Sequence, residues 1–540
     1  MKTWKVSILI IGLLLICVSF CEAAKKKSKS KDDKSVKDAE PVKLDRTVGD
    51  LAEIVSLRPI NVKGIGLVVG LGGTGSSECP PDMRDYLRKY IMTQVGRKDL
   101  INPDVMINSI DTAVVTVEGV IPAAASKYEA FDITVKPLPG TQTTSLAGGR
   151  LYTTDLKFVT RVEETLESSR TLAYAAGPIY TDNMPDSKTS PTNGLILGGG
   201  KVIEDYQITL ALYKPDFKAA AYIRNRINQR FGKDVANAVS ESVINVIVPQ
   251  FYQNKKSRFI MLVKSLYIAS NASLEEQRIN QLVDELKTVS DKSKPQVSLL
   301  AIGKPTIDKL LPLLDSNDIE IKFTVASNFI ALGDDRGLKV MRDFAQNTDS
   351  PLRMQAIVNI GEFASKNNAV ALMNRLVGDS NFDVRYTAYS YLRMHNDASI
   401  LRSIIAEDFF IDQIITPGPK IIFASRKQEP GIVLFGAPVD CEKGIYIESE
   451  DGNIIINSEP TDERVSILRK HPLTGGLMGP LKCSTRIADI IKLLGDPPSP
   501  KDDKKRPGLG VPYSEIVMML KNMVDKGAVN ASFVPGPVSQ

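Results

Sequence analysis

The sequence predicts an α+β protein that is interrupted in its second half by an all-α repeat. Before residue 272, short β-type runs mix irregularly with amphipathic helices, whereas residues 273–410 carry helical patterns throughout. Strand-type runs then return. Because the first pattern is irregular, we expect a mixed body with an insertion rather than a regular βαβ alternation.

Residues 206–231 give the clearest local signals in the first body. Hydrophobic side chains alternate along 206–212, which is typical of a half-buried strand, and 217–231 carry them at helical spacing. Asp216 is placed to cap the start of this helix, and Gly232 its end. Further strands are expected at 65–71, 113–117, 131–135, 243–248 and 259–268.

A weak repeat runs through the helical region. The basic residues Lys322, Arg353 and Arg385 recur about every thirty residues, and each is followed by an alanine, at 326, 356 and 388. This pattern resembles HEAT repeats, in which alanine permits close helix packing. Stacks of this kind act as binding or spacing modules and carry no chemistry of their own.

The last part of the chain divides into a β-rich segment, 411–476, and a C-terminal segment, 477–540. Strands are expected at 420–423, 432–435, 445–448 and 453–456. The C-terminal segment predicts helices at 484–494 and 513–526 around a loop rich in proline and lysine, 496–510, and then a strand at 529–534.

The N-terminus has the parts of a secretory signal peptide. Lys2 and Lys5 precede an apolar run from Val6 to Phe20, and small residues follow. We expect cleavage after residue 23; lipidation of Cys21 is the alternative, disfavoured because Phe20 stands where a small residue is needed. Residues 24–46 form a basic linker, expected to be disordered. No later segment is apolar enough to span a membrane, so the mature protein is expected to be exported and soluble.

The composition argues against several function classes. The net charge is only +5 over 540 residues, and much of that excess lies near the N-terminus, so no broad nucleic-acid-binding face is indicated. Two histidines leave little room for histidine catalysis or histidine metal sites. No catalytic, cofactor-binding or metal-binding residue is predicted. The mature chain keeps three cysteines, and Cys441 with Cys483 is the expected disulfide, on sequence proximity alone.

Gly70–Gly75 satisfies the G-x-G-x-x-G pattern and follows an apolar strand, so a dinucleotide site has to be considered. Such a site needs a helix that starts at once, whereas Cys79, Pro80 and Pro81 delay any helix to about Asp82. A glycine loop with unusual backbone angles is therefore the favoured interpretation.

Several stretches, in the same order along the chain, resemble the bacterial flagellar P-ring protein family. The glycine-rich stretch 58–75 is similar to that family's "GYGLVVGLxGTG", and 145–156 to its "SLxGGxLxxTPL". Further similar stretches are 113–117 with 131–135, 193–194, 212–228, 487–495 and 514–531. The resemblance covers 47–268 and 477–534, which makes 47–272 a P-ring-like domain.

The chain departs from the family at three kinds of place. The helical module 273–410 is not a usual part of the family, and 496–510 lengthens a turn that is normally short. Asn108, Thr144 and Ala147 stand where basic residues are common. If those basic residues make electrostatic contacts, this chain must make them otherwise, for example with Arg150 or Lys157.

The resemblance implies a non-enzymatic subunit of a periplasmic ring around the flagellar rod. Implied partners are further copies of the chain in a closed ring, the distal rod, the L-ring protein and a P-ring chaperone, with peptidoglycan as a further candidate. Two other hypotheses stay open: a monomeric periplasmic scaffold that binds partners through the helical repeats, and, remotely, a nucleotide-dependent oxidoreductase. The candidate interface residues are Gly70, Gly72, Gly73, Gly75, Ser145, Leu146, Gly148, Gly149 and Arg150.

Overall fold

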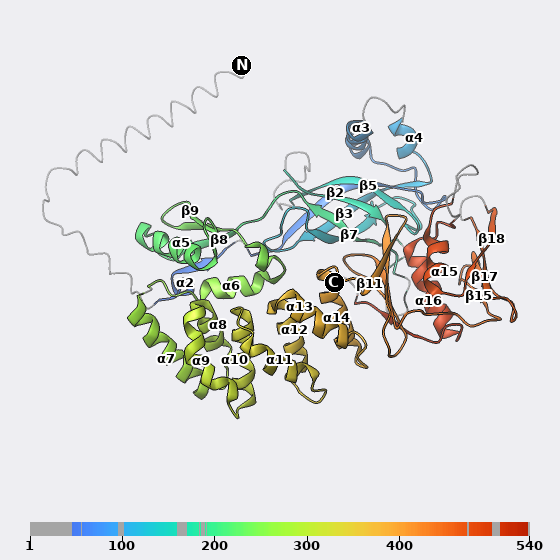
Figure 1. Ribbon diagram of the computed structural model, residues 1–540. Coiled ribbons are helices and arrows are strands. Elements are labelled where there is room, and N and C mark those ends of the chain that lie inside the picture. The colour runs from blue at the N-terminus through green and yellow to red at the C-terminus, as the bar shows by residue number, and fades with distance from the viewer. Residues whose placement is uncertain are drawn as a thin grey trace, which may run out of the picture.

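The computed structural model describes residues 46–537 except 56, 96–101, 159–169, 183, 185–189, 191, 270, 472–474 and 499–507. The predicted signal peptide and all but Arg46 of the predicted linker lie outside the described residues, as does most of the loop 496–510. Helices and strands are mixed, so the predicted α+β class is confirmed. Figure 1 shows an elongated body with a strand-rich upper layer, helices below it on the left, and a smaller body of strands and two helices on the right.

A closed barrel of six antiparallel strands forms the upper layer, in the order β2-β3-β4-β7-β6-β5. Its interior is filled by alternating side chains such as Val68, Val115 and Ile133, each almost fully buried. Every second side chain of these strands therefore points into the barrel, where these side chains form a packed core. The strands are β2 (Ile60–Val69), β3 (Thr112–Ile121), β4 (Ala130–Pro137), β5 (Arg150–Phe158), β6 (Thr171–Pro178) and β7 (Gly194–Val202).

A small sheet and three helices lie beside the barrel, at the left of Figure 1. Helix α5 (Phe217–Phe231) has the predicted bounds, because the Asp216 carboxylate accepts from two backbone N–H groups at its start and Gly232 ends it at φ 124°. The sheet order is β1-β8-β10-β9. Its strands are β1 (Ala52–Ile54), β8 (Ile208–Leu212), β9 (Ala236–Ala238) and β10 (Val243–Val246), and the other helices are α2 (Val48–Leu51) and α6 (Lys256–Lys264).

The strand expected at 259–268 is wrong. Residues 256–264 form α6, preceded by the 3₁₀ turn η1 (Gln250–Lys255). Phe259, Leu262 and Val263 are buried against α5 and the small sheet, and they recur at intervals of three and one, which places them on one helical face. A short, continuous apolar run does not separate a buried strand from a buried helix, and the packing decided between them.

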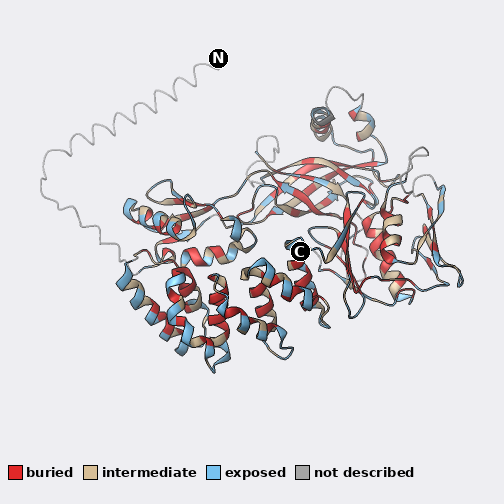
Figure 2. Ribbon diagram, viewed as in Figure 1, coloured by how far each residue is buried: buried red, intermediate tan, exposed pale blue. Residues whose placement is uncertain are grey.

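Eight helices stack below the small sheet and the barrel, and in this article they are called the helical array (Figure 1). Figure 2 shows their buried residues facing one another and their exposed residues along the lower edge. Helix α10 lies inside the stack, with Phe323, Ala326 and Phe329 all buried. The array comprises α7 (Ala272–Thr288), α8 (Ser293–Ile302), α9 (Ile307–Leu310), α10 (Ile319–Ala331), α11 (Arg336–Gln346), α12 (Arg353–Phe363), α13 (Lys366–Leu376) and α14 (Phe382–Met394). The resemblance of this stack to HEAT repeats stays a prediction.

A five-stranded sheet follows the helical array and is covered on both faces. Its order is β11-β12-β14-β13-β19, and β19 comes from the end of the chain, parallel to β13. Along β14, Val433 and Phe435 pack with the helical array, whereas Ile432 and Leu434 pack with the C-terminal helices. The strands are β11 (Ile400–Ile405), β12 (Phe409–Ile414), β13 (Ile421–Ala424), β14 (Gly431–Phe435) and β19 (Ser532–Pro535).

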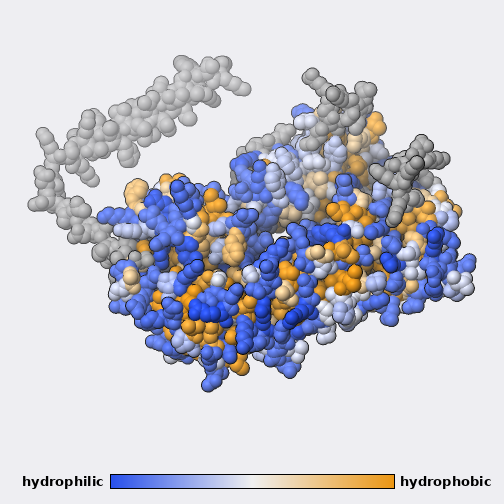
Figure 3. Space-filling view, in the orientation of Figure 1, coloured by the Kyte–Doolittle hydropathy of each residue, from blue (hydrophilic) through white to orange (hydrophobic). Residues whose placement is uncertain are grey.

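The C-terminal helices α15 (Ile487–Gly495) and α16 (Tyr513–Asp525) fill the space between this sheet and a last antiparallel sheet. That last sheet lies at the right edge of Figure 1. Its strands are β15 (Tyr446–Glu448), β16 (Ile454–Asn457), β17 (Arg464–Lys470) and β18 (Leu477–Ser484). No helix within the described residues is long and apolar enough to cross a bilayer. The visible face is mostly hydrophilic, with hydrophobic residues in separate patches (Figure 3).

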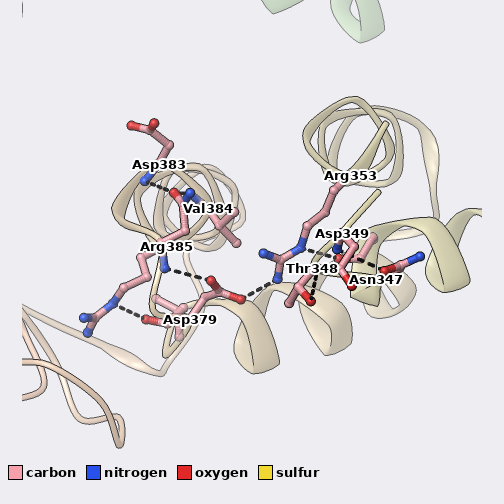
Figure 4. A network of polar contacts seen from close by, with 11 residues as sticks. Asn347, Thr348, Asp349, Arg353, Asp379, Asp383, Val384 and Arg385 are labelled. Atoms are coloured by element: carbon pink, nitrogen blue, oxygen red, sulfur yellow. Dashed lines mark hydrogen bonds and ion pairs between the residues drawn. The ribbon is translucent and has the colours of Figure 1, made fainter. Parts of the chain in front are cut away.

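Two of the repeated basic residues make the same contact. The Nε–H groups of Arg353 and Arg385 each donate, at 3.1 Å, to the carbonyl eight residues earlier, on Ala345 and Val377. These carbonyls lie at the C-terminal ends of the preceding helices α11 and α13, and the helix dipole favours a cation at that end. Arg353 also forms an ion pair with Asp379 of the following turn, so successive units are tied together (Figure 4).

A cationic contact joins the helical array to the layer above it. Lys255, at the end of η1, donates to the carbonyl of Glu362 on α12, and its ammonium lies 4.4 Å from the ring centre of Phe363. Arg258 of α6 stacks on the same ring at 4.1 Å. Both cations are half-buried at this contact, and burial lowers the pKa of each.

We predict that Arg385→Ala lowers the free energy of unfolding by about 2–4 kcal/mol, because Arg385 is fully buried and its loss leaves the carbonyls of Val377 and Pro419 without their donors. Urea denaturation of the purified chain measures this. Arg375→Ala, at an exposed position of α13, is the control and is expected to change stability little. Equal stabilities of the two variants would contradict the role given to Arg385.

Candidate assembly site

The predicted glycine loop lies directly after β2, at one end of the barrel. Gly70, Gly72 and Gly73 have φ angles of 81°, 61° and 85°. Because side chains with a Cβ rarely adopt such angles, glycine at these positions lets the strand end in a tight turn. The loop therefore has the unusual backbone that the sequence predicted, and α3 (Pro81–Val95) begins only at the second of the two prolines.

The glycine loop holds the segment that leads into β3. The N–H of Leu71 donates to the carbonyl of Asp111 at 2.9 Å, that of Gly75 to Ile110 at 2.9 Å, and that of Ser76 to Thr112 at 2.8 Å. A Cβ on Gly75 would lie 2.7 Å from the carbonyl oxygen of Ile110 and still nearer that of Thr112. Only glycine fits here, because both obstacles are backbone atoms.

The chain between these two anchored points forms a helical arm, which we define as α3 with α4 (Pro103–Ile107). Its inner side packs on β2 and β3 through buried residues that include Leu87, Ile91 and Ile107. Arg88 of α3 forms an ion pair with Asp104 of α4 at 2.8 Å. The arm projects from the top of the barrel, away from the helical array (Figure 1).

The second predicted segment, 145–150, lies against the glycine loop. Thr74 donates its hydroxyl to the carbonyl of Ser145 at 2.9 Å, and the N–H of Thr144 donates to the carbonyl of Thr74 at 2.9 Å. Leu146 and Gly149 are buried, so they support the loop from below rather than contribute to an outer surface. The structure thus brings together the two segments that sequence analysis proposed as one interface.

Arg150, the charged member of the predicted interface, already has a partner within the chain. Its guanidinium lies 2.6 Å from the carboxylate of Asp408, in the turn between β11 and β12. Both side chains are partly exposed, so the ion pair adds little stability, but it links the barrel to the five-stranded sheet. Asn108 and Thr144, where the family commonly carries basic residues, flank the same loop region.

A cavity of about 620 Å³ opens beside this segment, between the barrel and the C-terminal body. Its lining is rich in glycine and proline, and the described lining residues include no histidine or cysteine. Across the described part of the chain, no group of three or more His, Cys, Asp or Glu side chains is arranged to hold a metal ion. The cavity therefore lies where two packed bodies meet.

Sequence analysis missed the buried contact that holds these bodies together. Asp182, after β6, lies 3.4 Å from Arg426, after β13, and both side chains are almost fully buried. Arg426 also donates to the carbonyl of Gly536 at 2.8 Å. Nothing in the sequence relates Asp182 to Arg426, because 243 residues separate them. The one available signal was that each is an isolated charged residue beside an apolar strand.

The predicted disulfide partners lie on neighbouring segments. The N–H of Cys441 donates to the carbonyl of Thr485 at 2.9 Å, which places Cys441 beside the end of β18, where Cys483 lies. Burial raises the pKa of Cys441 to about 11; burial, then the nearby Asp489 and Cys441 raise that of Cys483 to about 12. Both cysteines are free thiols in the structure, and the disulfide stays a prediction.

The comparisons with known proteins include the barrel and its arm and extend beyond them. A family model described as flagellar P-ring protein matches residues 47–284. The flagellar P-ring protein of Hydrogenovibrio crunogenus is 28% identical over 264 residues, covering 47% of this chain and 69% of that protein. That of Desulfotalea psychrophila is 26% identical over 348 residues, covering 61% and 83%. Residues 47–284 of the chain are thus similar to flagellar P-ring proteins.

The part matched by the P-ring model runs from α2 into α7. It contains the whole barrel, the glycine loop, the helical arm and the small sheet with α5. Helices α8–α14 and the five-stranded sheet lie outside the matched residues. The glycine loop, the arm and residues 145–150 therefore all lie within the residues that the P-ring model matches.

We predict that Gly75→Val loosens the base of the arm, at a cost of about 2 kcal/mol, because the new side chain would overlap the carbonyl groups of Ile110 and Thr112. Hydrogen exchange of the peptides covering 71–76 and 110–112 should become faster. Ser77→Ala, at an exposed position of the same loop, is the control. Unchanged exchange in the Gly75 variant would show that the loop does not hold the arm.

We predict that the mature chain, purified from an oxidising compartment and unfolded without reductant, has one reactive thiol, Cys79, because Cys441 and Cys483 are paired. Cys441→Ser should then lower the free energy of unfolding by roughly 3–4 kcal/mol through the lost cross-link. Cys79→Ser is the control and is expected to have little effect. Three reactive thiols in the unfolded chain would refute the pairing.

Proposed function

We propose that this protein is a structural subunit of the flagellar P ring. Similarity to flagellar P-ring proteins over residues 47–284 carries the proposal, since the matched region includes a complete barrel with its projecting arm. Relatives described as flagellar P-ring proteins align over as much as 88% of their own length. The role requires shape and contacts rather than a reaction, and the candidate site is held mainly by backbone and apolar contacts.

A closed ring needs head-to-tail contacts between two different surfaces of one subunit. The elongated body of Figure 1 offers such surfaces at its two ends, with α5 and the small sheet at one end and the arm and the last antiparallel sheet toward the other. The glycine loop and residues 145–150 would fix the position of the arm in each copy. We infer that the ring lies in the periplasm, as the N-terminal signal sequence implies.

The proposed partners are the other copies of the chain, the distal rod inside the ring, the neighbouring L-ring protein and a P-ring chaperone, with peptidoglycan as a further candidate. The helical array lies mostly outside the residues that match the family. We therefore place it outside the ring, where it would contact peptidoglycan or another protein. Because the array shares its core with the five-stranded sheet, each subunit would hold it in one fixed position.

A monomeric periplasmic scaffold is the second candidate function. The observation that favours it is the extent of the helical array and the sheet behind it, which the family model does not match. Such a scaffold would bind partners through the helices and form no closed multimer. The state of assembly therefore separates the two functions.

We predict that a small tag inserted at 333–335, the exposed turn between α10 and α11, appears in electron micrographs as extra density on a ring around the rod of purified basal bodies. A strain without the protein should lack that ring. The tagged chain should unfold at the same temperature as the parent chain, which is the control for folding. A normal basal body in the deletion strain, with a purified protein that stays monomeric, would favour the scaffold.

A further inference from the structure

The arm has hydrophobic side chains on its outer side as well as its inner side. Met92 on α3, Val105 on α4 and Ile110 just after it are 60%, 68% and 60% exposed. Met92 lies one helical turn beyond Arg88, and Arg88 contacts Asp104, the neighbour of Val105. Met92 and Val105 therefore lie near each other on the arm, and Ile110 lies at its base, where its carbonyl accepts from the N–H of Gly75. Met92, Val105 and Ile110 are called the arm patch.

A second set of exposed hydrophobic side chains lies around the start of α5. Tyr213, Phe217 and Val239 are 60%, 72% and 60% exposed. The N–H of Asp216 donates to the carbonyl of Glu241 at 3.0 Å, which brings the start of α5 to the turn between β9 and β10. Figure 3 shows hydrophobic residues at the surface over α5 and β8. Tyr213, Phe217 and Val239 are called the α5 patch.

We propose that the arm patch of one copy packs against the α5 patch of the next copy in the ring. This inference rests on the proposed function and names the contact through which the ring would close. The two patches differ from each other, so the contact is head-to-tail, as a ring requires. The α5 patch lies at the left end of the body and the arm at its upper right, so neither blocks the other within one chain (Figure 1).

The composition of the patches suits a contact between proteins. Aromatic and methionine side chains are enriched in the cores of such interfaces, and exposed apolar clusters on a folded protein mark binding surfaces. Both patches also fall within residues 47–284, the part shared with P-ring proteins. A contact that closes a ring is expected in this shared part rather than in the unmatched helical array.

Both patches are held rigidly before any contact forms. The glycine loop fixes both ends of the arm through backbone hydrogen bonds. Helix α5 is capped by Asp216 and anchored by Ile223 and Ile227, which are fully buried. A surface that is already ordered loses little conformational entropy when it binds, so small patches suffice when each subunit makes two contacts in a closed ring.

The edge strand β11 is another exposed apolar surface, with Leu401 and Ile404 exposed by 49% and 68%. It lies outside the residues matched by the family model. It also lies in the central part of the body rather than at an end (Figure 1). We therefore use Ile404 as the matched control position, because its exposure equals that of Val105.

The first test is cross-linking between copies in cells that make only the variant chain. Val105→Cys combined with Phe217→Cys should give a ladder of linked multimers under mild oxidation, and each single variant should give at most dimers above the background of the parent cysteines. Val105→Cys with Ile404→Cys is the control pair and should give no ladder. No ladder from the test pair in cells whose rings are intact, or an equal ladder from the control pair, would overturn the proposal.

The second test counts rings in basal bodies. Phe217→Asp and Val105→Asp should each lower the number of rings by about tenfold, because a buried carboxylate without a partner opposes the contact. Ile404→Asp should leave the number unchanged, and all three chains should unfold at the parent temperature. Normal rings from the Phe217 and Val105 variants would overturn this contact while leaving the ring function intact. Absence of rings from the parent chain would instead overturn the proposed function.

Discussion

The five-stranded sheet requires cover on both faces, and much of the molecule is arranged to provide it. Every residue of β13 and β14 is buried, and successive side chains point alternately to the helical array and to the C-terminal helices. A sheet with two apolar faces cannot lie at a surface, because its exposed face would forgo the stabilisation that burial gives. Helix α14 covers one face and α15 with α16 the other.

This arrangement makes the helical array part of the body rather than an appendage. Residues of α14 share one core with β12, β13 and β14, and the buried Asp412 on β12 accepts from Tyr389 on α14 at 2.7 Å and from Arg402 on β11. At its other side, the array meets α6 through Lys255 and Arg258. Removing the whole array would therefore expose apolar surface on the five-stranded sheet and on the layer that contains α6. A functional test of the array needs substitutions at its surface instead.

The candidate assembly site depends on a different kind of contact. The glycine loop holds the arm through backbone contacts; it lets two backbone segments approach so closely that the arm begins and ends at nearly the same place. The arm is thus fixed relative to the barrel, and the barrel is fixed to the C-terminal body by the buried pair of Asp182 and Arg426. These two contacts therefore set the position of the arm relative to the core.

The sequence by itself determined the features that lie within short windows. The alternation in β8, the capped helix α5, the positive φ angles of the glycine loop and most of the helical character of 273–410 could be predicted, because propensity, periodicity and capping act over a few residues. The end of that helical prediction is wrong, because 400–405 form β11 and β12 begins at Phe409. The juxtaposition of the glycine loop with 145–150 came only from family resemblance. Tertiary structure alone decided that 256–264 is a helix, that six strands close into a barrel, that Arg150 pairs with Asp408, and that Asp182 meets Arg426. These depend on which distant segments pack together, and the free energy of that packing is set by the whole fold rather than by any local pattern.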